Sequence, residues 1–531
     1  MSQHGGYTHN SRSFCWPSGH HAETINNTEG SVIDSLSSLS QAPANSWPLL
    51  VTFVVYLLGI LVLGIRAYQQ THDLGDYLLG GRKLGSAVTA LSVGASDMSG
   101  WLLLGLPGAV YLSGLQESWI GIGLIIGAYL NWLLVARRLR VFSFHADNAL
   151  TLPDYLECRF RDESRLLRIL SAAVILLFFT FYAASGLVSG AILFESSFGL
   201  DYAVALLIGA VVIVSYTFVG GFLAVAWTDA IQACLMAAAL VMTPIAVFSA
   251  VGGTREVIEQ VALVNPNGLD LFGNIGALGL ISLLAWGLGY AGQPHILTRF
   301  MAIEDPAKLV SARRLAMSWM AIMLAGSVAT GFAGMAYFAA APLANPETVF
   351  ISLSQALFNP WMAGVITAAI LSAIMSTIDS QLLVCSSVIS EDFYRTFLRP
   401  QASSSELVLV SRLAVVGVAL ISLVIAMDRE SKVLDLVSYA WAGFGAAFGP
   451  VILLSLFMRS MTASGAIAGM LAGAITVIVW SNLSGGIFDL YEIVPGFVVS
   501  LTCILAVSLR WPESREKVLC QFEEARALSR N

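Results

Sequence analysis

Long apolar stretches recur along the whole chain, and they constrain its fold more than any other feature of the sequence. A helix needs about 20 apolar residues to cross the hydrocarbon core of a bilayer. Thirteen stretches of this kind can be marked in the 531 residues. Charged residues make up only 11% of the chain, whereas soluble domains carry roughly a quarter. We therefore predict an all-α integral membrane protein with about 13 transmembrane helices.

The N-terminal residues differ from the apolar middle. Residues 1–48 are rich in Ser, Asn, His and Gly and hold no apolar run, so we expect no secretory signal there. We expect a disordered extracytoplasmic extension over 1–45, a membrane domain over 46–510 and a short cytoplasmic tail over 511–531. The predicted spans are 49–65, 86–112, 118–136, 169–194, 202–221, 229–251, 273–296, 315–341, 360–388, 406–427, 433–458, 463–482 and 490–509.

The positions of the basic residues predict the orientation of the spans. If the N-terminus lies outside, 23 of the 27 Lys and Arg residues fall in cytoplasmic segments. Membrane proteins carry an excess of Lys and Arg in their cytoplasmic loops. The sequence therefore predicts a multi-pass protein of the cytoplasmic (inner) membrane, with its N-terminus outside and its C-terminus inside.

Two of the predicted spans are poor continuous helices. The span over 86–112 holds Asp97 between Gly94 and Gly100, and the span over 273–296 has three glycines and a proline within residues 286–294. Such residues loosen the backbone hydrogen-bond ladder, and freed backbone groups are tolerated in lipid only where they line a cavity or are buried in protein. Close helix packing is the alternative explanation for each segment alone. Two interrupted helices five spans apart favour an inverted-repeat transporter with a site at mid-membrane.

Several ordered motifs between about residue 46 and about residue 510 carry a family resemblance. They are Gly94–Trp101, Leu150–Tyr155, Gly220–Trp227, Trp286–Leu297, Met375–Thr377, Gln381–Ser387 and Val437–Pro450. Through them the chain resembles the sodium/solute symporter family, and within it the bacterial members that carry proline. The resemblance implies a LeuT-like five-plus-five inverted repeat and sodium-coupled uptake of L-proline. It also suggests a protomer that works alone.

The residues offer a sodium site at the first interrupted helix. Sodium takes oxygen ligands, which broken-helix carbonyls and hydroxyls of a facing helix can supply at mid-membrane. Helical spacing puts Ser376, Thr377 and Ser380 on one face of the span over 360–388. Such hydroxyls also bond back to a carbonyl one turn earlier, which is the alternative for Ser376 and Thr377. The resemblance assigns sodium to the carbonyls of Ala95, Met98 and Ala373 and the hydroxyls of Ser376 and Thr377.

Three further polar residues bear on this predicted sodium site. Asp97 is expected to supply the negative charge close to the ion, because an unpaired carboxylate is costly in hydrocarbon. Alternatively, its carboxylate satisfies N–H groups of the broken helix itself. Asp379 and Ser380 stand where the proline-carrying members have Ser and Cys. An extra acid beside the ion leaves the sodium-to-solute ratio open.

The solute site is expected where the two interrupted helices face each other, because half-helix N-termini can take a carboxylate and aromatic rings can cover an apolar ring. The aromatic residues could instead be ordinary packing residues. An inner gate formed by Arg82 and Asp229 is a weaker expectation, since charges at helix ends are commonly wetted anchors. The resemblance places solute contacts at Tyr182, Trp286, Tyr290 and Pro294, with Gly100, Trp101 and Ser380 close by.

Other function classes are less consistent with the sequence. We find no nucleophile–base pair, P-loop or metal-ligand spacing, so we expect neither an enzyme nor an ATP-driven pump, and no metal other than sodium. A transporter-like sensor would need a kinase domain, for which the tail is too short. A channel would rely on a ringed filter and a continuous pore. A symporter for another small solute, such as another amino acid, a sugar, pantothenate or choline, remains the main alternative.

Overall fold

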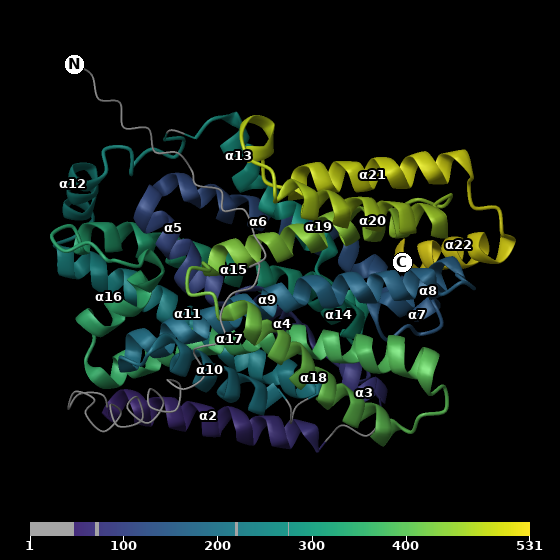
Figure 1. Cartoon of the computed structure of the whole chain (residues 1–531), viewed down its shortest axis with the longest axis horizontal. Coiled ribbons are helices and arrows are strands. Elements are labelled where there is room, and N and C mark those ends of the chain that lie inside the picture. Colours follow the sequence, from purple (N-terminus) through teal and green to yellow (C-terminus); the bar gives the residue numbers. More distant parts are fainter. Residues whose placement is uncertain (1–46, 70–73, 218–220, 274, 531) are drawn as a thin grey trace, which may run out of the picture.

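The computed structural model describes residues 47–69, 74–217, 221–273 and 275–530, so the extension predicted over 1–45 lies outside the described residues. Within these ranges the chain is helical throughout (Figure 1), and its one β-type contact is an isolated parallel bridge between Leu84 and Ile303. The predicted all-α class is therefore confirmed.

The helices follow the predicted spans. Among the described residues, ten helical stretches are long and apolar enough to cross a membrane, and one sharply bent pair makes an eleventh. Two shorter apolar helices, at Tyr202–Ser215 and Ala277–Gly292, fall on the remaining two predicted spans. The long stretches are α2 (Trp47–Tyr68), α6–η6–α7 (Ser118–Leu130, Asn131–Ala136, Arg137–His145), α9 (Leu166–Phe198), α11 (Phe222–Val251), α15 (Leu309–Tyr337), α17–η10 (Pro360–Ser387, Val388–Leu398), α18 (Ser404–Ala426), α19 (Val433–Phe457), α20 (Ala463–Trp480) and α21 (Ile493–Arg510).

The first interrupted helix consists of α4 (Ser86–Asp97), followed by η4 (Trp101–Gly105) and α5 (Leu106–Ser113). The two halves are bent by 61° at the break. Met98 ends α4 with a ψ of 82°, which no helix accommodates. A Cβ at Gly100 would lie 2.3 Å from Ser189 Oγ, so glycine is required for α9 to approach the break this closely.

The second interrupted helix runs through α13 (Ala277–Ala285), η7 (Trp286–Gly292) and α14 (Pro294–Ala302). Gln293 separates the last two with an extended ψ of 107°, and Pro294 opens α14 at a position where its missing N–H costs nothing. A Cβ at Gly292 would lie 2.2 Å from Phe444 O on α19. The predicted second break is confirmed, and its glycines let α19 pack directly on it.

Helices predicted on the same side of the membrane lie at the same end of the molecule. In Figure 1, α12 (Thr254–Val264) and α16 (Val349–Leu357) lie at one end, and α7, α8 (Leu152–Phe160) and α22 (Glu516–Arg530) lie at the other. The remaining elements are α3 (Leu74–Leu79), η3 (Gly80–Arg82), η5 (Leu115–Glu117), α10 (Tyr202–Thr217), η8 (Pro306–Lys308), η9 (Pro346–Thr348) and η11 (Gly486–Asp489).

The predicted tail forms a docked helix. Phe522 of α22 is 1% exposed, and its ring centroid lies 5.5 Å from that of Phe142 on α7. The guanidinium of Arg159 on α8 lies 4.8 Å from the same ring. Arg515, just before α22, donates to Phe160 O over 2.7 Å. The C-terminal residues therefore contact both α7 and α8.

Candidate functional site

The oxygens predicted for sodium gather where α4 ends against α17. Ser376 Oγ lies 2.8 Å from Ala95 O, and Thr377 Oγ1 lies 3.3 Å from the same carbonyl. Ser376 Oγ also lies 3.1 Å from Ala373 O in its own helix. Met98 is where α4 loses its helical backbone. Ser376 thus has both the cross-helix and the back-bonded contact, whereas Thr377 reaches across to α4.

Asp97 joins this group of oxygens to the aromatic residues. Its side chain is 3% exposed, and Oδ2 accepts a 2.6 Å hydrogen bond from Tyr290 OH. Its Oδ1 has no hydrogen-bond partner among the described residues. The backbone carbonyl of Asp97 accepts from Trp101 Nε1 at 3.0 Å and from Tyr182 OH at 3.4 Å. The carboxylate therefore bonds a residue of the other interrupted helix and not the N–H groups of its own.

Three of the four predicted aromatic residues, Trp101, Trp286 and Tyr290, belong to one cluster between the two breaks. The ring centroids of Trp101 and Trp286 lie 6.4 Å apart. Trp441 of α19 completes the cluster, since its Nε1 donates to Trp286 O over 2.7 Å and its ring lies edge-on to Tyr290 at 5.1 Å. Every one of these rings is buried. The cluster provides apolar and edge-on aromatic surfaces beside the Asp97 carboxylate.

The other predicted solute residues have different surroundings. Pro294 opens α14 next to the cluster, whereas Gly100 faces Ser189 and Ile374 as a packing contact. Ser380 is also buried away from the rings, because its Oγ donates to Ser376 O over 2.7 Å and accepts from Arg299 over 2.5 Å. Ser380 therefore links the ion-site helix to a buried cation.

Arg299 is that cation, and it bonds groups on three other helices. Its guanidinium makes a 2.8 Å ion pair with Asp229 on α11 and donates to Ser92 on α4 over 2.7 Å. It reaches Ser380 on α17 as well. Arg299 is 1% exposed, although it follows the predicted span over 273–296 and so falls in a segment expected in the cytoplasm. Four helices are thus tied together one turn away from Ser376.

The structure does not bring the expected gate residues together. Asp229 pairs with Arg299, and Arg82 donates to Asn148 Oδ1 at 2.9 Å and to Ala149 O at 2.8 Å. Arg82 also donates to Met301 O at the end of α14. The expected contact between Arg82 and Asp229 is therefore not formed in this structure. The reason is tertiary: α14 brings a second arginine to Asp229 that the chain order does not reveal.

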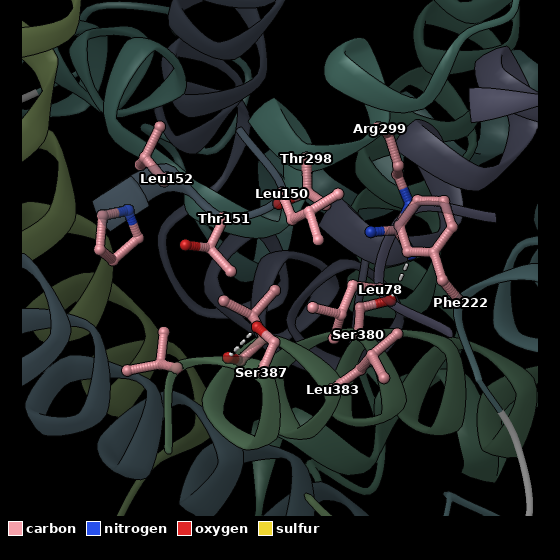
Figure 2. A pocket seen from close by; sticks show the side chains of 13 residues that line it. Leu78, Leu150, Thr151, Leu152, Phe222, Thr298, Arg299, Ser380, Leu383 and Ser387 are labelled. Carbon is pink, nitrogen blue, oxygen red and sulfur yellow. Dashed lines mark hydrogen bonds between the residues drawn. The ribbon is translucent and has the colours of Figure 1, made fainter. Parts of the chain in front are cut away.

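A pocket lies between the start of α8 and Arg299 of this ion pair. Figure 2 shows Arg299 and Ser380 facing each other across a dashed hydrogen bond, with Ser387 further along the wall. The pocket is bordered by α3, α8, α14 and α17 and the start of α11. Its lining residues are Leu78, Leu150, Thr151, Leu152, Pro153, Phe222, Thr298, Arg299, Ser380, Leu383, Val384, Ser387 and Val388.

Comparison with known proteins agrees with this geometry. The family described as the sodium:solute symporter family matches residues 77–473, which is most of the chain. The chain belongs to the sodium:solute symporter family. A sodium/proline symporter from Escherichia coli (strain K12) is 54% identical over 490 residues, covering 91% of this chain and 97% of that protein. A high-affinity proline transporter, PutP, from Bacillus subtilis (strain 168) is 51% identical over 468 residues, covering 88% and 98%.

The fold of this family member is also found in solved structures. The structure of a sodium-coupled sialic acid symporter in a substrate-bound, outward-open state superposes with a TM-score of 0.74. The match covers 88% of this chain and 99% of that one at 20% identity, so it speaks for the fold alone. The predicted LeuT-like fold is therefore confirmed. That the chain is a transporter and not an enzyme follows from its membership of the symporter family.

Sequence reasoning missed several polar residues of this symporter's interior. Arg299 and His295 lie on α14, and Asn131 donates to Tyr290 O over 3.0 Å. The signal for Arg299 was available, because an ionisable residue within a membrane helix marks a functional site by default. Because Arg299 follows the end of a predicted apolar span, the sequence suggests a loop position for it. Trp441 lay within a quoted motif, but only the fold brings its ring to Tyr290.

Proposed function

We propose that this family member uses an inward sodium gradient to carry L-proline across the cytoplasmic membrane by alternating access. The observation that carries the proposal is 54% identity over 97% of the length of a sodium/proline symporter. A second proline transporter, from a different organism, is 51% identical over a similar range. Identity of this extent covers both interrupted helices and the helix that faces them.

Sodium is assigned to the oxygens at the end of α4, as co-transported substrate. The hydroxyl oxygens of Ser376 and Thr377 lie within hydrogen-bond distance of Ala95 O, so each hydroxyl can donate its proton to that carbonyl. Rotation of the two hydroxyls would turn their lone pairs inward, and a sodium ion would then take the place of those protons among the same oxygens. Ala373 and Met98 supply the remaining carbonyls, and buried Asp97 supplies the charge nearby. These residues fit a hard cation with oxygen ligands.

Coupling follows from the contacts of Asp97. Its carboxylate holds Tyr290, and its carbonyl holds Tyr182 and Trp101. An ion that orders the end of α4 therefore orders the aromatic cluster that covers the solute ring. The coupling is reciprocal, so bound solute must tighten sodium binding by the same factor. A membrane potential of 100 mV contributes about 2.3 kcal/mol for each sodium charge.

Release to the inside is assigned to the pocket beyond Arg299. Arg299 and Ser380 line this pocket, and Ser380 Oγ donates to Ser376 O. The ion pair of Arg299 with Asp229 and its bond to Ser380 therefore lie between the proposed sodium oxygens and the pocket. Separation of α14 from α17 would break the Ser380 bond and open a path between the two. This makes Arg299 and Asp229 the inner gate, in place of Arg82 and Asp229.

The placement in the membrane belongs to the same proposal. The bias of basic residues puts the N-terminus outside and the C-terminus inside, with the α8 and α22 end facing the cytoplasm. The proposal includes the division into an extension over 1–45, a transport domain over 46–510 and a tail over 511–531. It also includes that the protein works as a monomer.

The test is uptake of radiolabelled L-proline into proteoliposomes that hold the purified protein, with and without an inward sodium gradient. We expect sodium-dependent accumulation, and its loss in Asp97→Ala because the negative charge and the Tyr290 contact both disappear. Proline uptake that does not depend on the sodium gradient would refute the coupling. Absence of proline uptake from folded protein would refute the substrate and leave the fold standing.

A further inference from the structure

His295 is a buried polar side chain at the second helix break for which the described structure shows no partner. It follows Pro294 in the first turn of α14 and is 0% exposed. Neither Nδ1 nor Nε2 has a hydrogen-bond partner among the described residues. Because buried polar side chains are almost always hydrogen-bonded, such a group calls for a specific explanation.

The imidazole lies against the predicted solute residues. Its ring centroid is 6.1 Å from that of Tyr182 and 5.5 Å from that of Phe179, both on α9. Phe179 in turn packs on Phe444 of α19 at 4.4 Å. His295 therefore packs against aromatic rings, and its N–H has no hydrogen-bond acceptor among them. It directly follows Pro294 in the chain.

The side-chain donors of the neighbouring residues Arg299 and Gln293 are already occupied. Arg299, one turn along α14, donates to His295 O over 2.8 Å and is otherwise bound to Asp229, Ser92 and Ser380. Gln293 Nε2 donates to Gly289 O at 3.3 Å and to Trp441 O at 3.4 Å. The N–H groups at the start of a helix have no acceptor within the helix, although that of Leu297 donates to Gln293 O over 3.0 Å, and the dipole there favours an anion. His295 thus adds a free side-chain donor to a backbone that attracts negative charge.

We infer that His295 is a specificity-determining contact that donates a hydrogen bond to the carboxylate of the transported amino acid. This rests on the proposed function, and it adds a residue for which neither the family resemblance nor the relatives' names supply a role. Either tautomer of the neutral imidazole presents one N–H to a carboxylate oxygen. Trp286 and Tyr290 cover the apolar ring of the solute, while His295 and the start of α14 hold its charged end.

The test compares two ligands that differ only at the carboxylate. Apparent affinities for L-proline and for L-prolinamide are measured by competition against sodium-driven uptake of radiolabelled L-proline, in the wild type, His295→Phe and His295→Gln. Phe keeps the ring and removes an unpartnered polar group, so the variant should fold. We expect the preference for L-proline to fall about tenfold in His295→Phe, as for loss of a hydrogen bond to a charged group. We expect partial recovery in His295→Gln, which restores a donor.

Phe179→Leu is the control, since it alters the same wall without touching a polar group. It should shift both affinities together and leave their ratio unchanged. An unchanged ratio in His295→Phe would overturn the inference and leave the imidazole a packing residue. Absence of proline uptake by the wild type would instead refute the proposed function, so the two failures are distinguishable.

Discussion

At the scale of single residues, the bond between Tyr290 and Asp97 is the most direct link between the two halves of the site. It joins the interrupted helices through one 2.6 Å contact between a phenol and a carboxylate, both buried. Hydrogen bonds to charged groups contribute about 1.5–3 kcal/mol. A bond of this strength would suffice to couple the proposed sodium site to the proposed solute site.

Tyr290→Phe should therefore weaken the coupling while keeping the ring. In the wild type, sodium should raise the apparent affinity for proline. We expect the factor of this increase to be about fivefold to tenfold smaller in Tyr290→Phe, which corresponds to a loss of coupling free energy of about 1 kcal/mol. The measurement is the KM for proline at several sodium concentrations. Tyr439→Phe is the matched control, because the Tyr439 ring packs on Phe178 and Phe181. Among the described residues, its hydroxyl makes no recorded hydrogen bond. Equal sodium dependence in Tyr290→Phe and wild type would contradict the role of the bond.

At the scale of elements, the second interrupted helix depends on close contact with α19. Gly292 faces a backbone carbonyl of that helix, which cannot move aside as a side chain can. The break and the helix that packs on it are therefore one structural unit.

Gly292→Ala should disrupt this unit. The added Cβ would lie 2.2 Å from Phe444 O, so η7 and α19 must separate, and we expect loss of proline uptake with a lower melting temperature in detergent. Gly417→Ala on α18 meets nothing within 4 Å and should remain close to wild type in both measurements. A fully active Gly292→Ala protein would show that the contact tolerates separation.

A second feature at this scale is the N-terminal end of α19. A carboxylate from another element accepts hydrogen bonds from its first N–H groups. Glu347 of η9 accepts from Val433 N at 3.3 Å and from Leu434 N at 3.4 Å. Burial raises the pKa of Glu347 from 4.5 to about 7, against the opposing effect of the two N–H groups. Since the folded protein then binds the proton more tightly than the unfolded chain, this group's contribution to stability is full below about pH 4.5 and is lost as the pH rises towards 7.

Glu347→Gln should remove that pH dependence, because the amide keeps an acceptor for α19 but does not titrate. We expect the difference in melting temperature between pH 5 and pH 7.5 to be smaller in the variant than in the wild type. Thermal unfolding followed at both pH values in the same detergent checks this. An identical difference in the two proteins would mean that other groups set the pH profile.

At the scale of the whole molecule, α22 holds together two elements at one end of the molecule, α7 and α8. Phe522 lies against Phe142 of α7 and under the Arg159 guanidinium of α8. α7 continues a helix that crosses the molecule, whereas α8 is a short helix outside the long spans. The docked α22 therefore ties the last residues of the chain to segments more than 300 positions earlier.

Phe522→Ala should destabilise the protein without touching the transport site. Removal of a buried phenylalanine costs about 3–5 kcal/mol, so we expect a clear fall in melting temperature. Leu528→Ala is the control on the same helix, since Leu528 is 47% exposed and should have little effect. Equal melting temperatures for the two variants would show that α22 is not held by Phe522.

The sequence by itself determined the fold class, the thirteen apolar stretches and the two breaks. These are local properties: hydropathy over some twenty residues decides a span, and glycine and proline decide where a helix cannot continue. It also predicted which oxygens would surround sodium, because Ala95 and Ser376 belong to motifs that carry the family resemblance. The assignment of Asp97 to the sodium site stays a prediction, now with a known bond to Tyr290.

Only the tertiary structure decided which polar groups meet. Asp229 pairs with Arg299 and not with Arg82, Ser380 turns to that arginine, and Trp441 closes the aromatic cluster. His295 becomes notable only when its surroundings are known to lack an acceptor for it. The physical reason is that partners 70 to 155 residues apart are chosen by which helices pack together. That choice follows from the packing of the entire bundle, and no local pattern of the chain records it.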